Sequence, residues 1–311
     1  MIVTVTLNPA FDHILFLPEI NLGKFNRVQS TTRMPGGKGI NVACSLAVLG
    51  EEVIATGLLG GQGCSTFERA LRKTGVTTSF IYVNQEIRTD FFIIEEKANR
   101  QSLIVEKGNS IELRYLNSFK SNFDRLLTSA KLIEIGGSLP SGVAPNFVKE
   151  LILAANKKKV KVVLNLPENI FAECMYDTNP FLVYPDLREN KSMFGLDIYN
   201  PEARLKIANK LLEIGVEIVM LKYGNLNYVV ATRSEMWEGQ IDLEETSVMI
   251  GVRDAVLAGF IHKYLEKENI GEALKYGLGA GRSSAKNRMN YPNSKNEVEE
   301  FLLMAKVRKV G

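Results

Sequence analysis

The residues best suited to chemistry in this sequence lie at positions 35–41, where the chain reads PGGKGIN. Gly36 and Gly37 directly precede a helical pattern, VACSLAVLG, so their backbone amides can approach an anionic or hydroxyl-rich ligand at a helix amino terminus. Lys38 adds a point charge at the same place. The segment is not the phosphate-binding loop G-x-x-x-x-G-K-[ST], because its spacing differs and no serine or threonine follows the lysine. The alternative is a glycine turn with a solvated lysine.

The elements that must position this loop follow an alternating pattern. From residue 130 onwards, short apolar runs alternate with helical patterns: KLIEIGG, a helix near 144–157, VKVVLNL, a short helix, PFLVY, another helix and VEIVMLKYG. This alternation predicts a parallel sheet with crossover helices. The carboxyl-terminal part is expected to form two or three helices, which begin near Asp254 and Gly271 and end in a charged, frayed tail.

Four further stretches look like strands but fall outside this alternation. They predict a small separate sheet which, placed over the carboxyl edge of the main sheet, would act as a lid. The four stretches lie near 12–18, 26–34, 89–95 and 101–106. The whole chain, 1–311, is therefore expected to be a single α/β domain with this lid as an appendage.

Composition limits the classes of function that fit this chain. Its 311 residues are 45% hydrophobic and 23% charged, as in an ordinary globular protein. The net charge of +3 is spread along the chain, so nucleic acid is not expected as a partner. No apolar run approaches the roughly 18 residues that a membrane helix requires. We therefore expect no membrane partner and a cytoplasmic location.

The motifs along the chain resemble those of one kinase family. PGGKGINVA is similar to the first signature of the ribokinase-like (PfkB) carbohydrate kinases, in which this loop holds the sugar. TLNPAFD (6–12), LGKFNR (22–27), LLGGQG (58–63) and GSLPSG (137–142) resemble further family motifs in the same order. They look most like the branch of 1-phosphofructokinase and tagatose-6-phosphate kinase. The resemblance covers nearly the whole chain and implies a three-layer α/β/α body with a mostly parallel central sheet and a small β-sheet lid.

The resemblance implies adjacent sites for a sugar and for its phosphate. The family aspartate that binds sugar hydroxyls is Asp12 here, and a carboxylate suits vicinal hydroxyls, although an aspartate after a strand is also a common turn residue. Lid arginines and a loop serine hold the phosphate in the family, since a guanidinium fork and a hydroxyl match its oxygens. The residues implied for the sugar are Asp12, Gly36, Gly37, Lys38 and Asn41, and those for the phosphate are Arg27, Arg88 and Ser138.

The second family signature, N-T-x-G-A-G-D at the start of a helix, reads MIGVRD here, at 249–254. In the family it supplies the catalytic base and the amides that neutralise the transferring phosphoryl group. The resemblance therefore implies Asp254 as general base and a γ-phosphate site at the Gly251 turn. The alternative role for Asp254 is a helix N-cap. Arg253 replaces the glycine before the aspartate, and its side chain would either crowd the γ-phosphate or give it a charged donor.

Three more segments depart from motifs for the nucleotide and its metal. The family's K-P-N-x-x-E is YPDLRE here, so Asp186 and Glu189 are implied to order Mg²⁺. KYGNLNYVV resembles the nucleotide loop S/T-x-G-x-x-G, with an asparagine for its second glycine, and D-T-S-G has become NLPE at 165–168. Small residues in GLGAGRSSAKN let a helix lie close to adenine, or alternatively pack closely in the core. The residues implied for ATP are Lys222, Gly224, Asn227, Gly251, Gly281 and Asn287.

Together these features predict phosphoryl transfer from MgATP to a hydroxyl of fructose 1-phosphate or tagatose 6-phosphate. The lid is expected to clasp a second subunit in a homodimer. The rival interpretation is a degenerate relative that binds nucleotide with little kinase activity and acts as a sensor, because the departures concentrate at the phosphoryl-transfer end. A third interpretation is a kinase for a nucleoside or a plain sugar. It is disfavoured because Lys38, Arg27 and Arg88 would converge without an anion to meet.

Overall fold

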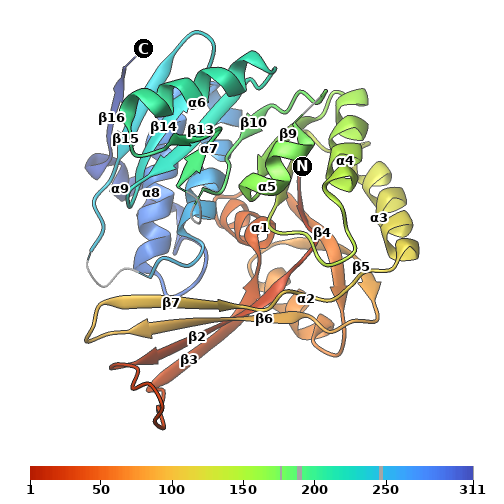
Figure 1. Cartoon of the computed structure of the whole chain (residues 1–311), viewed down its shortest axis with the longest axis vertical. Helices are drawn as coiled ribbons and strands as arrows, with labels where there is room; N and C mark the ends of the chain where they lie inside the picture. Colours follow the sequence, from red (N-terminus) through yellow and green to blue (C-terminus); the bar gives the residue numbers. More distant parts are fainter. Residues whose placement is uncertain (176, 188–190, 245–247, 311) are drawn as a thin grey trace.

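A computed structural model describes residues 1–175, 177–187, 191–244 and 248–310. The alternating pattern builds one ten-stranded sheet (Figure 1). In order across the sheet, the strands are β16 (Lys306–Lys309), β15 (Met236–Gln240), β14 (Asn227–Ala231), β13 (Ile218–Tyr223), β10 (Leu182–Val183), β9 (Lys161–Asn165), β8 (Leu132–Gly136), β1 (Ile2–Thr6), β4 (Val53–Gly60) and β5 (Thr77–Val83). In this order, the strands from β13 to the β5 edge run parallel to one another, while β14, β15 and β16 pair antiparallel at the other edge.

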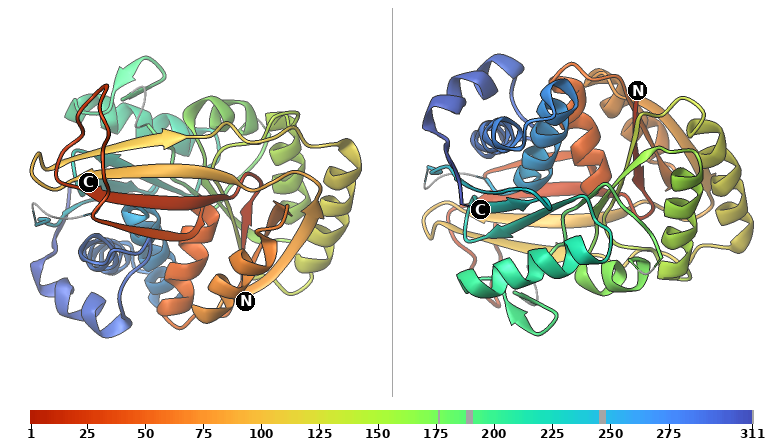
Figure 2. Two further views of the ribbon diagram at one scale, coloured as in Figure 1. Left: turned by 90° about the horizontal axis from the view of Figure 1, so that it is seen from below. Right: turned by 90° about the horizontal axis from the view of Figure 1, so that it is seen from above.

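Helices cover both faces of this sheet, which confirms the α/β/α prediction (Figure 2). Side chains alternate along β1, so Val3 and Val5 pack in one apolar core while Ile2 packs in the other. The first core is covered by α3 (Leu113–Leu126), α4 (Pro145–Lys157), α5 (Glu168–Cys174) and α6 (Pro201–Glu213). The second is covered by α1 (Lys38–Val48), α2 (Cys64–Lys73), α7 (Val252–Lys267) and α8 (Ile270–Lys286), with α9 (Lys295–Phe301) and the 3-10 turn η1 (Leu302–Met304) against α8. A two-stranded hairpin, β11 (Ser192–Met193) and β12 (Leu196–Asp197), precedes α6.

The four strand-like stretches outside the alternation form a second sheet of four strands, called the small sheet below. Its order is β3 (Ser30–Gly36), β2 (Ala10–Leu17), β6 (Arg88–Glu95) and β7 (Arg100–Val105). The central pair, β2 and β6, is parallel, and the two outer pairs are antiparallel. In Figure 1 the small sheet lies across one end of the body and extends past it.

One face of the small sheet packs on the chain just before α7. Ile14, Phe16 and Ile94 from the sheet form an apolar cluster with Val248 and Ile250. The side chain of Gln101 also accepts a hydrogen bond from the backbone N–H of Met249, at 3.0 Å. The segment that leads into α7 is therefore held by the small sheet as well as by the body.

Two predicted boundaries differ from the structure. The stretch 26–34 becomes a strand only at Ser30, because Asn26 exchanges hydrogen bonds with the backbone of Asn21 and closes a loop instead. The prediction of a frayed carboxyl-terminal tail is wrong, since β16 pairs with β15 and Arg308 forms an ion pair with Glu238 at 2.7 Å. Charged side chains here mark an edge strand, which they protect from pairing with other chains.

In the described ranges, no helix is both long and apolar enough to cross a membrane.

Candidate active site

The PGGKG loop joins β3 to α1 and requires glycine at positions 36 and 37. A side chain on Gly36 would overlap the carboxyl group of Asp12, which packs directly against it. Gly37 is the N-cap of α1 with φ of 109°, a value that favours glycine, and a Cβ there would lie 2.9 Å from Thr6 Cγ2. Lys38 is the first residue of α1. The structure thus brings the predicted sugar residues Asp12, Gly36, Gly37 and Lys38 together.

The Asp12 carboxyl group is buried in β2, opposite Asp90 of the neighbouring strand. Burial, followed by the charge of Asp90, raises the pKa of Asp12 to about 8, against the opposing influence of Asn290 and Arg88. A carboxyl group with this pKa holds its proton more readily than an exposed one. It therefore accepts or donates hydrogen bonds to a ligand according to pH.

Asn290 connects the PGGKG loop to the centre of the candidate site. Its side-chain amide lies close to three acceptors: the Asn41 side-chain oxygen at 2.7 Å, the Pro35 carbonyl at 2.8 Å and the Asp12 carboxyl at 3.4 Å. Asn290 is buried and was not predicted as a site residue. No motif marks it, because it lies 249 residues from Asn41 and 278 from Asp12 in the sequence.

Asp254 lies in the first turn of α7, and its side chain does not cap the helix. Gly251 is the N-cap residue, and the turn has no side-chain cap hydrogen bond. Instead, the Asn41 amide donates to Asp254 Oδ2 at 2.8 Å and the Asn165 amide donates to Oδ1 at 3.0 Å. The N-cap alternative is therefore wrong. Asn165 also turns out to hold Asp254, although its segment reads as a lost nucleotide motif in the sequence.

Gly251 forms a left-handed turn immediately before α7, with φ of 69°. A side chain there would overlap the carbonyl oxygen of Asn290. Only glycine fits both constraints without strain. The turn is thus packed against the residue that links Asp12 to Asn41.

Arg253 is turned toward the segment that follows β10. Its Nε donates to the Tyr184 hydroxyl at 3.1 Å, its Nη2 donates to the Pro185 carbonyl at 3.4 Å, and the guanidinium lies 4.9 Å from the centre of the Tyr184 ring. The Tyr184 hydroxyl also lies 3.2 Å from that of Tyr228. Two departures from the family pattern, Tyr184 and Arg253, are therefore in direct contact.

Asp186 completes this cluster with a carboxylate between two cations. Lys38 Nζ lies 2.6 Å from Asp186 Oδ2, and Arg253 Nη1 lies 3.0 Å from Oδ1. Asp186 thus joins the PGGKG loop to the start of α7. Its predicted metal partner, Glu189, lies outside the described residues.

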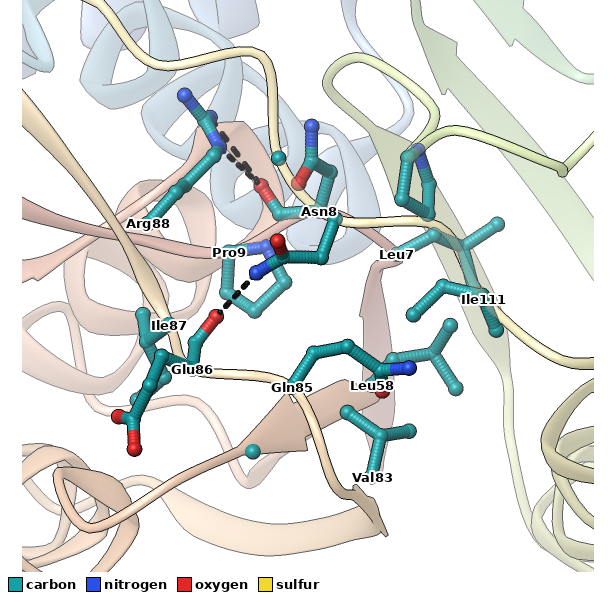
Figure 3. A pocket seen from close by; sticks show the side chains of 14 residues that line it. Leu7, Asn8, Pro9, Leu58, Val83, Gln85, Glu86, Ile87, Arg88 and Ile111 are labelled. Carbon is teal, nitrogen blue, oxygen red and sulfur yellow. Dashed lines mark hydrogen bonds between the residues drawn. The ribbon is translucent and has the colours of Figure 1, made fainter.

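The predicted phosphate residue Arg88 is buried at the start of β6 (Figure 3). Its guanidinium donates to the Asn8 carbonyl at 3.2 Å, to the Glu106 carbonyl at 3.1 Å and to the Asp90 carboxylate. It lines a cavity of about 30 Å³, which holds little more than a water molecule. A sugar phosphate does not fit into this cavity.

Ser138 and Arg27 occupy different surroundings. Ser138 is exposed and accepts a hydrogen bond from the Asn8 side chain at 3.2 Å, which places it near the backbone that Arg88 binds. Arg27 is exposed in the loop between β2 and β3, where it lines a shallow hollow with Glu19 and Lys97. Within one chain, the structure does not bring Arg27 together with Lys38 or Arg88.

The predicted nucleotide residues lie at the turn between β13 and β14 and along α8. Lys222 Nζ donates to the Gly224 carbonyl at 2.6 Å, and Gly224 has φ of 59°. A Cβ on Gly224 would lie 2.8 Å from the Asn227 amide, so the turn is closed around these three residues. A Cβ on Gly281 would overlap Val256 of α7, so this glycine allows close helix packing.

Asn287 is the C-cap of α8, and its side-chain amide donates to the Tyr291 carbonyl at 3.2 Å. Its position leaves it half-buried at the end of the helix that packs on α7. The amide stabilises the turn that leads to Asn290. A role in binding adenine stays a prediction.

The donor set of the site suits Mg²⁺ that arrives with phosphate groups. Mg²⁺ keeps several waters and takes one or two protein carboxylates plus substrate oxygens. In the described ranges no group of three or more His, Cys, Asp and Glu side chains could hold a metal alone, and Asp186 is the carboxylate of the predicted pair that the structure describes. The site therefore fits a metal shared with a nucleotide rather than a protein cage.

Comparison with known proteins places this geometry in a family. Residues 5–292 match the family described as pfkB family carbohydrate kinase. A tagatose-6-phosphate kinase from Staphylococcus epidermidis is 27% identical over 284 residues, which are 89% of this chain and 91% of the relative.

Solved structures show the same fold. A possible 1-phosphofructokinase from Thermotoga maritima has 29% sequence identity and a TM-score of 0.93, over 100% of this chain and 99% of that one. Phosphofructokinase-2 from Escherichia coli, in complex with substrates and products, has 20% identity and a TM-score of 0.88, over 97% and 98% of the two chains. Since the family match spans nearly all of the sequence, the chain belongs to the pfkB family of carbohydrate kinases.

Proposed function

We propose that this protein transfers the γ-phosphoryl group of MgATP to a hydroxyl of fructose 1-phosphate or tagatose 6-phosphate, with Asp254 as general base. The observation that carries the proposal is the geometry of the Asp254 carboxylate, which Asn41 and Asn165 hold by one amide hydrogen bond on each oxygen. Neutral amides fix its orientation without giving it a proton or a full counter-charge. The carboxylate can then take the proton of an attacking hydroxyl.

The sugar would lie between Asp12 and Asp254. Asp12, Gly36, Gly37 and Asn41 would bind its hydroxyls, and the chain of hydrogen bonds through Asn290 sets the spacing of the two carboxyl groups. The acceptor hydroxyl loses its proton to Asp254 as its oxygen bonds to the γ-phosphorus, and the bond to the ADP oxygen breaks. Positioning and charge neutralisation account for most of the rate in such a loose transition state.

The charged groups would bind the phosphates at the two ends of this arrangement. Arg88 and Ser138, which lie on either side of Asn8, are proposed for the phosphate already on the sugar, together with the more distant Arg27. The Gly251 turn and Arg253 are proposed for the γ-phosphate. Mg²⁺ supplies positive charge to the phosphate oxygens when bound, and Asp186 is the described side chain that would hold it.

The adenine end would lie over the β13–β14 turn and α8. Lys222, Gly224 and Asn227 offer a closed turn, and Gly281 removes a side chain where α8 meets Leu226 of that turn, whose Cδ1 lies 3.6 Å from the Cβ position. Asn287 is proposed beside the base.

ADP release from MgATP tests the proposal directly. Purified protein is assayed with fructose 1-phosphate, tagatose 6-phosphate, fructose 6-phosphate, plain fructose, ribose or no sugar. Release that needs one of the two named acceptors and is lost in Asp254→Asn supports the kinase. A preference for an unphosphorylated ligand contradicts the acceptor class.

A second candidate function is nucleotide binding with little turnover, in a sensing role. It is favoured by the cluster of Arg253 and Lys38 on Asp186, which occupies the carboxylate proposed for the metal. ATP binding without ADP release under any of these conditions would favour this candidate.

We also propose that a second copy of the chain covers the small sheet. All six residues of β7 are exposed, and Ile104, which is 57% exposed, pairs across the strands with Phe91 on the face turned away from the body. Leu15 of β2 and Ile93 of β6 are paired in register and extend this apolar face. The face is therefore larger than the single exposed apolar residues that are common on the surface of a monomer.

Light scattering during size-exclusion chromatography should give the mass of a dimer for the wild type and the mass of a monomer for Ile104→Lys. A monomeric wild type contradicts the proposal.

A further inference from the structure

The Asp186 carboxylate lies between two cations that come from different parts of the active site. Lys38 begins α1 directly after the sugar loop, and Arg253 directly precedes the proposed base in α7. The distances to Asp186 are 2.6 Å from Lys38 Nζ and 3.0 Å from Arg253 Nη1. The side chains of Lys38, Arg253 and Asp186 are 15%, 14% and 7% exposed, so water screens their charges only weakly.

Uncharged groups hold Arg253 in place independently of Asp186. The Tyr184 hydroxyl and the Pro185 carbonyl accept hydrogen bonds from two of its nitrogens, and the Tyr184 ring lies under the guanidinium. Tyr184 is itself fully buried and contacts Tyr228. The cation therefore keeps its position when its anionic partner changes.

The Asp186 side chain can move while its backbone stays fixed. The Asp186 N–H donates to the Leu166 carbonyl at 2.9 Å and holds the segment to the main sheet. Rotation about its side-chain bonds would withdraw the carboxylate without breaking this backbone hydrogen bond. Asp186 is therefore the group whose place we expect a stronger anion to take.

Two largely buried cations that face one another need an anion between them, because each otherwise remains buried without a counter-charge. A terminal phosphoryl group suits this position better than a carboxylate, since it has more negative charge and three acceptor oxygens. It would lie between the sugar loop and the helix that carries Asp254, which is where a group in transfer must be.

We infer that in the nucleotide-free protein Asp186 occupies the binding position of the phosphoryl group in transfer, and that this group displaces it and is then bound by Lys38 and Arg253. The inference rests on the proposed kinase function and deepens it. Asp186 is then an internal competitor of the nucleotide. Once displaced, the carboxylate needs a new counter-charge, which Mg²⁺ bound with the nucleotide would supply.

The test is the affinity for ATP without Mg²⁺, measured by calorimetry in excess EDTA. In the wild type the Asp186 carboxylate competes with ATP for the site. Without Mg²⁺ the displaced carboxylate has no cation to pair with, so the wild type should bind ATP weakly. Asp186→Asn removes the competitor and should tighten binding of Mg²⁺-free ATP about tenfold or more, since a site blocked most of the time loses apparent affinity by that fraction. Asp186→Ser, a smaller neutral replacement, should do the same and guards against poor folding of either variant.

The chain offers a matched control at the other end of α1. Glu51 also lies between two basic groups, His262 at 2.9 Å and Lys131 at 3.1 Å. Glu51→Gln should bind Mg²⁺-free ATP as the wild type does. Adding Arg253→Met to Asp186→Asn should remove the gain in affinity, because one of the two cations is then lost.

An unchanged or weaker affinity in both neutral Asp186 variants overturns the inference, as does a gain that persists without Arg253. Absence of ATP binding in the wild type and both variants overturns it too. Sugar-dependent ADP release by the wild type is measured separately. If the affinity rises but no sugar supports release, the anion site stands and the kinase proposal fails; if release occurs and the affinity does not rise, the reverse holds.

Discussion

The two ends of this active site hold their carboxylates in different ways. In the part proposed to bind the sugar, neutral amides contact two carboxyl groups: Asn290 contacts Asp12, while Asn41 and Asn165 contact Asp254. In the part proposed to bind the phosphoryl group, two cations bind a third carboxylate, Asp186.

The difference follows from what each carboxylate has to do. An amide orients a carboxylate and leaves most of its charge available for a proton, which suits a base. An ion pair neutralises a carboxylate and makes it a poor base, but it also keeps two cations together until a stronger anion arrives. Three departures from the family pattern, Tyr184, Asp186 and Arg253, belong to the second arrangement, whereas Asn165 belongs to the first.

The largest effect should come from removing the charge of the amide-held base. Asp254→Asn keeps the size of the side chain but cannot accept a proton, so kcat should fall about 10²–10⁴-fold, the usual contribution of a general base. Steady-state kinetics give kcat, and calorimetry should show that the sugar still binds.

Glu272→Gln is the control, because Glu272 also lies in the first turn of its helix, α8, but is exposed. It should leave kcat unchanged. A kcat for Asp254→Asn near that of the wild type would remove Asp254 from the base role.

The amide network itself can be broken at its centre. Asn290→Leu leaves acceptors on Asn41, Pro35 and Asp12 without their shared donor, so kcat/KM for the sugar should fall about 10–100-fold, in line with an unsatisfied buried polar group.

Asn122→Leu is the control, because the Asn122 amide in α3 also joins distant residues, Thr56 and Ser79, but has no role in the proposed site. This variant should leave kcat/KM for the sugar near the wild-type value. Equal effects of the two variants would mean that Asn290 only supports the local fold.

The raised pKa of Asp12 predicts a pH dependence of stability. The folded protein keeps this proton up to about pH 8, whereas the unfolded chain releases it near the ordinary value of 3.8. The stabilisation is therefore complete below about pH 4 and is lost as pH rises to 8. Between pH 5 and 8, the wild type should lose on the order of 1–3 kcal/mol more free energy of unfolding than Asp12→Asn in urea titrations. Parallel pH profiles of the two proteins would contradict a raised pKa.

The smallest effect concerns the ion-paired end. Asp186→Asn and Arg253→Met, made singly and together, should show a coupling of about 0.5–3 kcal/mol in the free energy of unfolding, because the two side chains are in direct contact. Additive effects would mean that the ion pair contributes nothing measurable.

Arg253→Gly alone should lower kcat, since the structure places the guanidinium on Asp186 and Tyr184 as a source of charge.

The sequence predicts most of the fold and half of the site. Its alternating apolar runs predict the parallel sheet, and PGGKGIN predicts a ligand loop, because local patterns determine both. Asp254 stands out only through the resemblance of MIGVRD to the second family signature, since the local pattern of an acid at the start of a helix suggests an N-cap, which the structure does not show.

The remaining residues could not be predicted, because their roles depend on contacts between distant segments. Asn165 contacts Asp254 across 89 residues, and Arg253 contacts Tyr184 across 69. In the sequence, Arg253 and Asp186 are separate departures, and only the structure shows that they form one ion pair. The carboxyl-terminal tail is wrongly predicted to be frayed, because its charged local sequence is typical of a disordered segment. Its order comes from pairing with β15, a strand that is distant in the sequence.

The apolar contact between the small sheet and the chain before α7 bears on the fidelity of the enzyme. Val248 and Ile250 rest against Ile14, Phe16 and Ile94, and Ile250 is followed directly by the Gly251 turn. A small sheet that moved away would leave this stretch without its apolar cover, and the turn that would bind the γ-phosphate without its support. In that event we expect poor catalysis of ATP hydrolysis, so that water would seldom replace the sugar as acceptor.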